Sequence, residues 1–228
     1  HVICHGIPSS RVLEEGDIIN IPTGIFRGFE NIGSNYGMIM AILGGDDAGG
    51  GVTWAPQVIQ DAAEHGLILG ENGRLYDSKK GETLPENLKP MPLLSKDFLA
   101  QVPEPKAKNL VPRYVARYND LMAFAAHEPI QVIGEKGILP DKPGFNIDFL
   151  TRSPILEVPE SFENSAVLMP MRGHWKLSWE GGNVVLNPGD TCLLEPGFSH
   201  RIEPSVTGEA SLYRILSNED PAGPTWVD

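Results

Sequence analysis

Apolar and polar residues alternate in short runs along much of this chain, and glycine or proline separates many of the runs. Period-two alternation bounded by such turn residues is typical of β-strands. In the C-terminal half the pattern predicts strands at residues 130–134, 145–151, 154–158, 165–171, 174–179, 183–186, 191–195, 199–204 and 210–216. A further apolar strand is expected at residues 34–43. The pattern therefore predicts a protein dominated by β-structure.

Two short helices are expected to interrupt the β-pattern. The first covers residues 57–65, because Pro56 suits the first helical position and Gly66 follows the end. The second covers residues 113–124. Residues 73–112 are rich in proline, lysine and glutamate and are expected to form a linker that wraps over the surface.

Residues 16–31 repeat residues 189–204 with a constant offset of 173 positions and without a gap. The matched pairs include Gly16 and Gly189, Asp17 and Asp190, Gly24 and Gly197, and Glu30 and Glu203. The same register extends back to His1, which matches His174, and forward to Asp47, which matches Asp220. A gapless repeat of about fifty residues indicates a duplicated structural unit.

The second copy contains the run GDTCLLEPGFSH at residues 189–200. Its spacing (Gly, six residues, Pro-Gly, two residues, His) resembles the second conserved motif of the cupin family, which places a metal-ligating histidine inside a small antiparallel β-barrel. The resemblance implies an all-β-dominated fold of two cupin barrels, or double-stranded β-helices, with a few short helices. The first copy has Arg27 where the second has His200, and a guanidinium group is not a metal ligand. If the protein holds a metal, only the C-terminal barrel is therefore expected to hold it.

The repeat also predicts how the chain is divided. Residue 1 corresponds to a position deep inside the second barrel, so the first barrel is expected to be incomplete at its N-terminus. Residues 1–54 are expected to form the C-terminal half of the first barrel, residues 55–128 a helix, a proline-rich linker and a helix, and residues 129–228 the second barrel and a tail. A native chain is expected to carry roughly a hundred further residues before residue 1, because a half-barrel exposes an unpaired sheet edge.

Composition narrows the classes of partner. The net charge of −12 argues against nucleic acid and anionic membrane surfaces, and no apolar run approaches the roughly 20 residues needed to span a bilayer. Cys4 and Cys192 match no zinc pattern and are interpreted as buried free thiols, which fits a cytoplasmic location.

The usual cupin ligands are absent from the first motif of the second barrel. Counting back from Gly173, Ala166 stands where a glutamate is usual, and residues 159–162 contain no His-x-His. His200 is then the one histidine placed on the inner wall by the motif, while the direction of His174 depends on the parity of its strand.

Carboxylates that could join His200 are Glu157, Glu160 and Glu163. Glu157 lies in an apolar strand, where a carboxylate needs a metal ion, an arginine or a proton. The alternatives are therefore metal ligation or a salt bridge with a nearby arginine, for which Arg152, Arg172 and Arg201 are the candidates.

Four further runs, PTGIFRGFEN at 22–31, LGGDD at 43–47, VTWAP at 52–56 and GHWKLSW at 173–179, resemble the large subunit of the two-component hydroquinone 1,2-dioxygenases. That family has a metal-free N-terminal barrel and one non-haem Fe(II) in its C-terminal barrel, held by an amide side chain, a glutamate and a histidine. The resemblance assigns the last two ligands to Glu157 and His200. Ser153 stands at the amide position, where a water, Glu160 or Asn164 could take its place.

The resemblance implies cleavage of a small hydroquinone-type aromatic ring by dioxygen at Fe(II), in a hetero-oligomer with a smaller partner subunit. The rest of the pocket would be apolar, and the candidates for its lining are Phe162, Leu168, Trp175, Trp179 and Phe198. Plain core packing is the competing interpretation for these side chains. Two other functions stay open: a metal-free cupin that binds or acts as a scaffold, and another metal cupin enzyme, an isomerase or decarboxylase, acting on a small acid.

Overall fold

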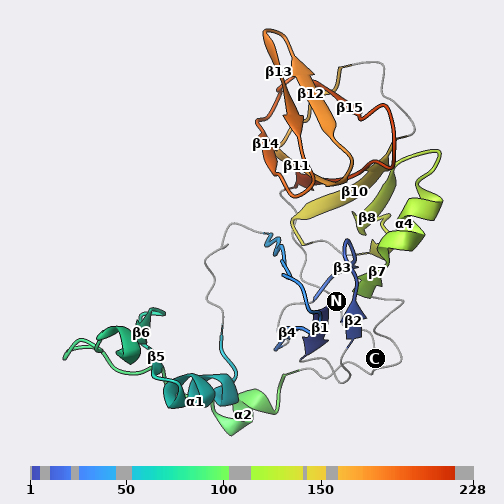
Figure 1. Ribbon diagram of the computed structural model, residues 1–228. Helices are drawn as coiled ribbons and strands as arrows, with labels where there is room; N and C mark the ends of the chain where they lie inside the picture. Colours follow the sequence, from blue (N-terminus) through green and yellow to red (C-terminus); the bar gives the residue numbers. More distant parts are fainter. Residues whose placement is uncertain are drawn as a thin grey trace.

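The computed structural model describes residues 2–5, 11–21, 26–44, 53–102, 114–140, 143–152 and 159–218. Within these residues β-strands predominate, and the helices are short. Figure 1 shows the strands of the C-terminal part gathered at one end of the molecule, with the N-terminal strands and a small helical unit at the other. No helix of the described ranges is long and apolar enough to cross a membrane.

The C-terminal part is built from two sheets. The larger has the strand order β14-β11-β16-β10-β8-β9, and the smaller has the order β13-β12-β15. The larger sheet consists of β8 (Ile130–Gly134), β9 (Leu139–Pro140), β10 (Phe145–Thr151), β11 (Ala166–Arg172), β14 (Cys192–Leu194) and β16 (Ser211–Ser217). The smaller consists of β12 (Trp175–Trp179), β13 (Gly182–Leu186) and β15 (Arg201–Pro204).

The strand order is that of a two-sheet jelly roll. The chain passes from β10 and β11 in the larger sheet to β12 and β13 in the smaller, returns to β14, crosses again to β15 and ends in β16. This alternation between antiparallel sheets is the architecture to which cupin barrels belong. The expected fold class is confirmed, and each expected strand that falls within the described residues of this part matches an observed strand to within two residues. The short strand β9 was not expected. The strand expected at residues 154–158 lies outside the described residues.

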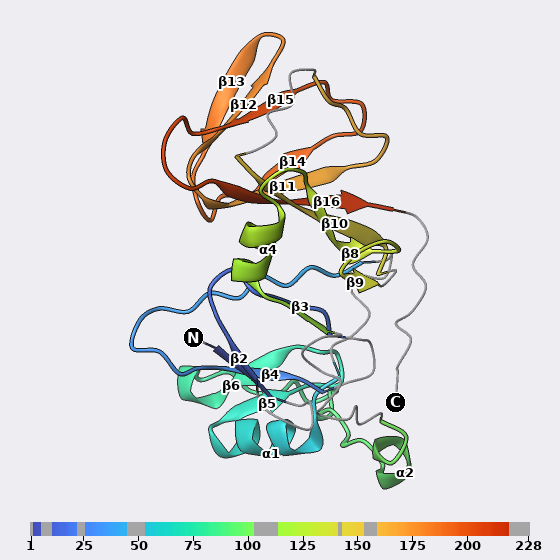
Figure 2. The ribbon, with the colours of Figure 1, turned by 90° about the vertical axis from the view of Figure 1, so that its right-hand side faces the viewer.

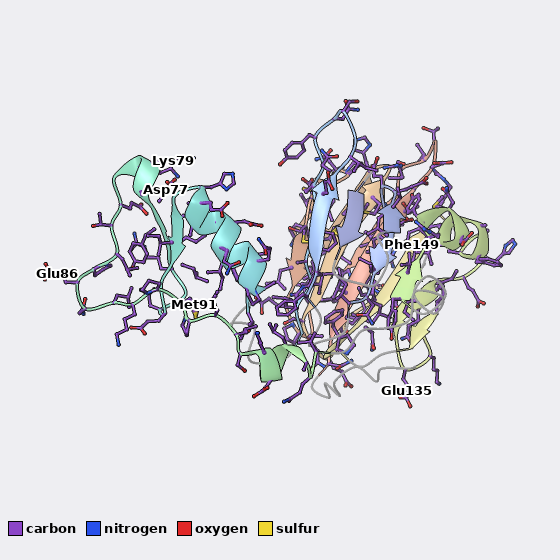
Figure 3. The ribbon with its side chains drawn as sticks, turned by 90° about the horizontal axis from the view of Figure 1, so that it is seen from below. Asp77, Lys79, Glu86, Met91, Glu135 and Phe149 are labelled. Atoms are coloured by element: carbon purple, nitrogen blue, oxygen red, sulfur yellow. The ribbon has the colours of Figure 1, made fainter. Side chains whose placement is uncertain are left out.

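Successive side chains of a strand in the larger sheet point to opposite faces, so the two faces of this sheet contribute to two separate apolar layers. In β16, Leu212 belongs to the inner layer between the sheets, whereas Tyr213 and Ile215 belong to the outer layer. The outer layer is covered by α4 (Tyr118–Phe124), which Figure 2 shows between the barrel and the N-terminal strands. Phe149 is fully buried in this layer (Figure 3). The barrel interior and the docking of the N-terminal part therefore use opposite faces of one sheet.

The sequence repeat is also a structural repeat. The N-terminal sheet has the order β2-β1-β4, formed by β1 (Val2–His5), β2 (Arg11–Leu13) and β4 (Gly28–Asn31). Val2 pairs with Leu13 in the first sheet, and Trp175 pairs with Leu186 in the second. Both residues of the second pair lie 173 positions after their counterparts in the first pair. The β1–β4 and β12–β15 pairs agree in the same way.

The turn that follows each hairpin is duplicated as well. The backbone nitrogen of Glu14 donates to the carboxylate of Asp17 at 3.0 Å, and that of Asn187 donates to the carboxylate of Asp190 at 2.7 Å. In return, the backbone nitrogens of Asp17 and Asp190 donate to the carbonyl oxygens of Glu14 and Asn187. The hydrogen bonds from the backbone and side chain of Asn187 lower the pKa of Asp190.

The first of these turns docks against the C-terminal part. Asp17 accepts hydrogen bonds from Nη1 of Arg117 at 2.6 Å and from the backbone nitrogen of Tyr118 at 2.8 Å. The hydroxyl of Tyr213 donates to the carbonyl oxygen of Gly16 at 2.7 Å. Burial raises the pKa of Tyr213, so its hydroxyl stays protonated and keeps donating.

The strand expected at residues 34–43 is absent, and residues 32–44 form no regular element. Tyr36 and Met38 are exposed. The 173-residue offset places residues 38–44 on β16, which is flanked by β10 and β11, but within the described ranges no strand pairs with residues 38–44. A strand needs a neighbour to satisfy its backbone hydrogen bonds, so an apolar pattern alone is not enough.

Short regular elements lie in the middle of the chain, both before the expected linker of residues 73–112 and within its described part, residues 73–102. These elements are α1 (Pro56–Glu64), β5 (Leu67–Leu69), β6 (Leu75–Asp77), the 3-10 helix η1 (Ser78–Lys80) and α2 (Lys96–Leu99). The first expected helix is thus confirmed as α1. The side chain of Asp77 caps η1 by accepting from the backbone nitrogen of Lys79 at 3.0 Å (Figure 3). The second expected helix begins only at Tyr118, because β7 (Val115–Ala116) pairs with β3 (Ile18–Ile19).

Candidate functional site

His200 stands immediately before β15, where the motif turn places it. Its backbone nitrogen and carbonyl oxygen both bond to Glu160, at 2.9 and 2.8 Å. The backbone nitrogen of Gly197, in the Pro-Gly turn, donates to the carbonyl oxygen of Phe162 at 2.8 Å. The turn is therefore joined to residues 160–162, and only 1% of His200 is exposed.

The imidazole of His200 lies between two aromatic rings. The Phe198 ring is stacked on it at 6.0 Å between centroids, and the Phe162 ring is tilted against it at 5.4 Å. Nδ1 lies 2.9 Å from the carbonyl oxygen of Phe198, which can only accept, so Nδ1 carries the proton and donates. Nε2 is then left as a lone-pair donor.

This Nε2 atom is buried and has no hydrogen-bond partner among the residues that the structure describes. A buried polar atom without a partner costs about 1–3 kcal/mol, so such atoms are uncommon unless they have a function. Histidines that ligate metals typically donate their other ring N–H to a carboxylate or a backbone carbonyl. The geometry of His200 matches that arrangement, with Nε2 free for a metal ion or for the proton of a ligand.

A charged cluster lies beside the histidine. Glu160 and His200 are directly opposed in an antiparallel bridge, so their side chains share one face. Nη1 of Arg214 lies 3.3 Å from the carboxylate of Glu160, while its Nη2 donates to Asp148 at 2.9 Å. The guanidinium also lies 5.2 Å from the Phe162 ring centroid. Phe162 thus contacts both His200 and the arginine.

Arg214 and Asp148 were not singled out from the sequence, although a signal exists. They are single charges inside the apolar strands SLYRILS and FNIDFLT. Arg214 has the parity of Leu212, and Asp148 has that of Leu150; both leucines belong to the inner layer. A charge at an inward position of a β-strand is costly unless paired, so parity would have identified them as partners.

The five expected pocket side chains differ in position. Phe162 and Phe198 flank His200, and Trp179 is 36% exposed with its ring 5.9 Å from that of Phe198. Leu168 and Trp175 are fully buried in the inner layer.

The indole nitrogen of Trp175 donates to backbone carbonyls at 3.2 Å, so this residue fills the core.

His174 is exposed and does not enter the barrel. Cys192 is half-buried beside the inner layer, and burial raises the pKa of its thiol. The cysteine is thus a poor nucleophile at neutral pH.

Ser153 and Glu157, the other expected metal ligands, lie outside the described residues. Among the residues that are described, no group of three or more His, Cys, Asp or Glu side chains is arranged to hold a metal ion. The described part of the site therefore offers one certain donor, Nε2 of His200, with Glu160 as its carboxylate neighbour.

No family model matches this chain, and no curated protein matches it. Among solved structures, a cupin-2 domain protein from Shewanella frigidimarina is 14% identical, with a TM-score of 0.37 over 45% of this chain and 94% of that chain. A cupin 2 domain-containing protein from Halorhodospira halophila is 20% identical, with a TM-score of 0.36 over 40% of this chain and 63% of that chain. Apo-HppE is 16% identical, with a TM-score of 0.28 over 32% of this chain and 42% of that chain. These scores are low, and the fold assignment stands on the strand order described above.

Proposed function

We propose that the interior of the second barrel is a metal-dependent active site and that the protein is a non-haem Fe(II) ring-cleaving dioxygenase for hydroquinone-type aromatics. It would act as the large subunit of a hetero-oligomer with a smaller subunit. The observation that supports the site is the buried Nε2 of His200, which has no hydrogen-bond partner in the described part of the chain and belongs to a ring that lies between two phenylalanine rings. The reaction class is supported by the sequence resemblance.

The residues fit an iron ion in part. His200 supplies a neutral nitrogen ligand, and Ser153 and Glu157 are the candidates for the remaining positions, with Glu160 as the neighbouring alternative. A facial set of two or three nitrogen and oxygen ligands is what non-haem Fe(II) oxygenases use. When bound, Fe(II) supplies a positive charge that lowers the pKa of a phenol and a redox centre for work with dioxygen.

The chain itself would supply orientation and exclusion of water. The hydrogen bond from Nδ1 of His200 to Phe198 fixes the imidazole plane. Phe162 and Phe198 present apolar faces against which an aromatic ring can pack. In the overall reaction both atoms of dioxygen enter the hydroquinone, the ring bond beside a hydroxyl carbon breaks, and a semialdehyde acid is formed.

A second function, a metal-free binding or scaffold protein, is favoured by one specific observation. Glu160, the carboxylate beside His200, already forms an ion pair with Arg214 at 3.3 Å. In that case the Nε2 atom of His200 would accept a hydrogen bond from an organic ligand instead of binding a metal.

Oxygen uptake and metal content separate these functions. The protein, purified with any subunit that accompanies it, is loaded anaerobically with Fe(II), freed of excess metal and mixed with hydroquinone. We expect retained iron and iron-dependent oxygen uptake in the wild type, and loss of both in His200→Ala. His174→Ala is the matched control, because this exposed histidine belongs to the same barrel. If the wild type retains no iron and consumes no oxygen, the metal-free function is the better one.

A further inference from the structure

The charges of the barrel interior indicate which class of ring it accepts; this inference rests on the proposed use of the interior as a substrate site. The buried polar or charged residues in the described part of the chain are His200, Ser211 and Arg214. Arg214 is thus the one buried cation of that part. An arginine in a pocket is the usual means of recognising a substrate carboxylate, through two parallel hydrogen bonds.

In this barrel the arginine is already occupied. Nε and Nη2 both donate to Asp148, at 3.3 and 2.9 Å, and Nη1 faces Glu160 at 3.3 Å. One face of the guanidinium lies over the Phe162 ring. The side chains of Arg214 and Asp148 are 11% and 14% exposed, so water screens this pair poorly.

The cluster carries one positive and two negative charges, a sum of −1 beside His200. A ligand with its own carboxylate would meet this negative charge, and the guanidinium of Arg214 already faces two carboxylates. A neutral ring would avoid that repulsion and pack on the phenylalanine faces. The net charge of the cluster thus disfavours binding of a small acid and does not disfavour binding of an uncharged phenol.

We propose that Asp148 and Glu160 determine specificity by neutralising Arg214, so that the interior selects a neutral aromatic ring over its carboxylated analogue. Asp148 acts from the neighbouring strand β10, directly opposite Arg214 on β16. Glu160 acts from beside His200.

The test compares three ligands that share one ring: hydroquinone, 2,5-dihydroxybenzamide and 2,5-dihydroxybenzoate. The amide and the acid have nearly the same size and differ in charge. Binding is measured by isothermal titration on the protein without added metal, so that the readout reports the charges of the chain itself. We expect the wild type to bind the acid at least about tenfold more weakly than the amide, the scale of one unfavourable charge interaction.

Two variants identify the residues responsible. Glu160→Gln brings the sum of the cluster to zero and is expected to remove most of the difference between the acid and the amide. Glu203→Gln is the matched control, because this exposed residue on β15 faces Lys176 at 3.9 Å outside the interior. It is expected to leave the ratio unchanged. Circular dichroism verifies that both variants are folded.

Each remaining result overturns the inference. Equal or tighter binding of the acid by the wild type shows that the cluster does not repel anions. A difference that Glu160→Gln leaves intact, or exclusion of both substituted rings while hydroquinone binds, shows that shape and not charge selects. Failure of hydroquinone itself to bind, both to the protein without added metal and after anaerobic Fe(II) loading, removes the proposed site as well. This distinguishes failure of the proposed function from failure of the charge argument alone.

Discussion

Gly16 and Gly189 occupy equivalent turns of the two repeats, with φ angles of 89° and 90°. An alanine at either position meets the same unfavourable left-handed backbone, which costs about 1–2 kcal/mol. The surroundings differ, however. A Cβ atom at Gly16 would lie 2.5 Å from Cδ2 and 2.7 Å from Cγ of Tyr118, whereas a Cβ atom at Gly189 has nothing within 4 Å.

Tyr118 has little room to move away from such a methyl group. Its hydroxyl lies 2.6 Å from Oγ of Ser211, and its ring meets that of Phe149 edge to face at 5.7 Å. Overpacking of this kind typically costs about 1–3 kcal/mol. We therefore expect Gly16→Ala to reduce the free energy of unfolding by about 1–3 kcal/mol more than Gly189→Ala does.

Urea unfolding of the wild type and the two alanine variants, followed by tryptophan fluorescence, measures the difference. Because the backbone strain is common to both, the excess for Gly16→Ala isolates the contact with Tyr118. In a Tyr118→Ala background this excess should vanish. Equal costs for the two glycine variants in the wild-type background would refute the reasoning, since they would mean that the first turn is not docked as described.

Two further predictions concern ion pairs. Arg214→Met leaves Asp148 unpaired in the interior and should lower the free energy of unfolding by about 3–5 kcal/mol. Lys176→Met removes one partner of an exposed ion pair and should lower it by no more than about 1 kcal/mol. Similar losses for the two variants in urea unfolding would contradict this expectation. Glu15 is exposed, and a hydrogen bond and the charge of Arg172 lower its pKa below 4.5. Its stabilisation, at most about 1 kcal/mol, is complete above that value and is lost as the pH falls through the folded pKa. Glu15→Gln should thus weaken the protein at pH 7 but not in acid, and an acid-insensitive difference in unfolding free energy would disprove the pairing.

Local patterns were enough to predict most of the second barrel. Short alternating runs gave eight of its described strands to within two residues, because each run is bounded by turn residues and has a neighbour to pair with. The two-residue strand β9 is too short to show such a pattern. The Pro-Gly spacing placed His200, since one tight turn fixes which face the histidine takes. Both inferences depend on residues close together in the sequence.

What sequence reasoning missed depends on distant neighbours. Asp148 and Arg214 are 66 positions apart, and only the adjacency of β10 and β16 makes them partners. Residues 34–43 have the composition of a strand but no neighbour among the described residues. Tyr118 meets Gly16 only after the N-terminal unit has docked. In each case a contact, or its absence, with residues distant in the sequence decided the outcome.

The exposed turn at Asp190 closes with the same reciprocal hydrogen bonds as the docked turn at Asp17. Its conformation is therefore intrinsic to the turn and does not require a binding surface. For the docked turn at Asp17, this means that hydrogen bonds within the turn itself already fix its conformation. The conformational entropy of the turn is therefore lost before it contacts the C-terminal part. Association of the N-terminal unit with Arg117 and Tyr118 then joins preorganised surfaces, and less of the interaction energy is consumed in ordering the chain.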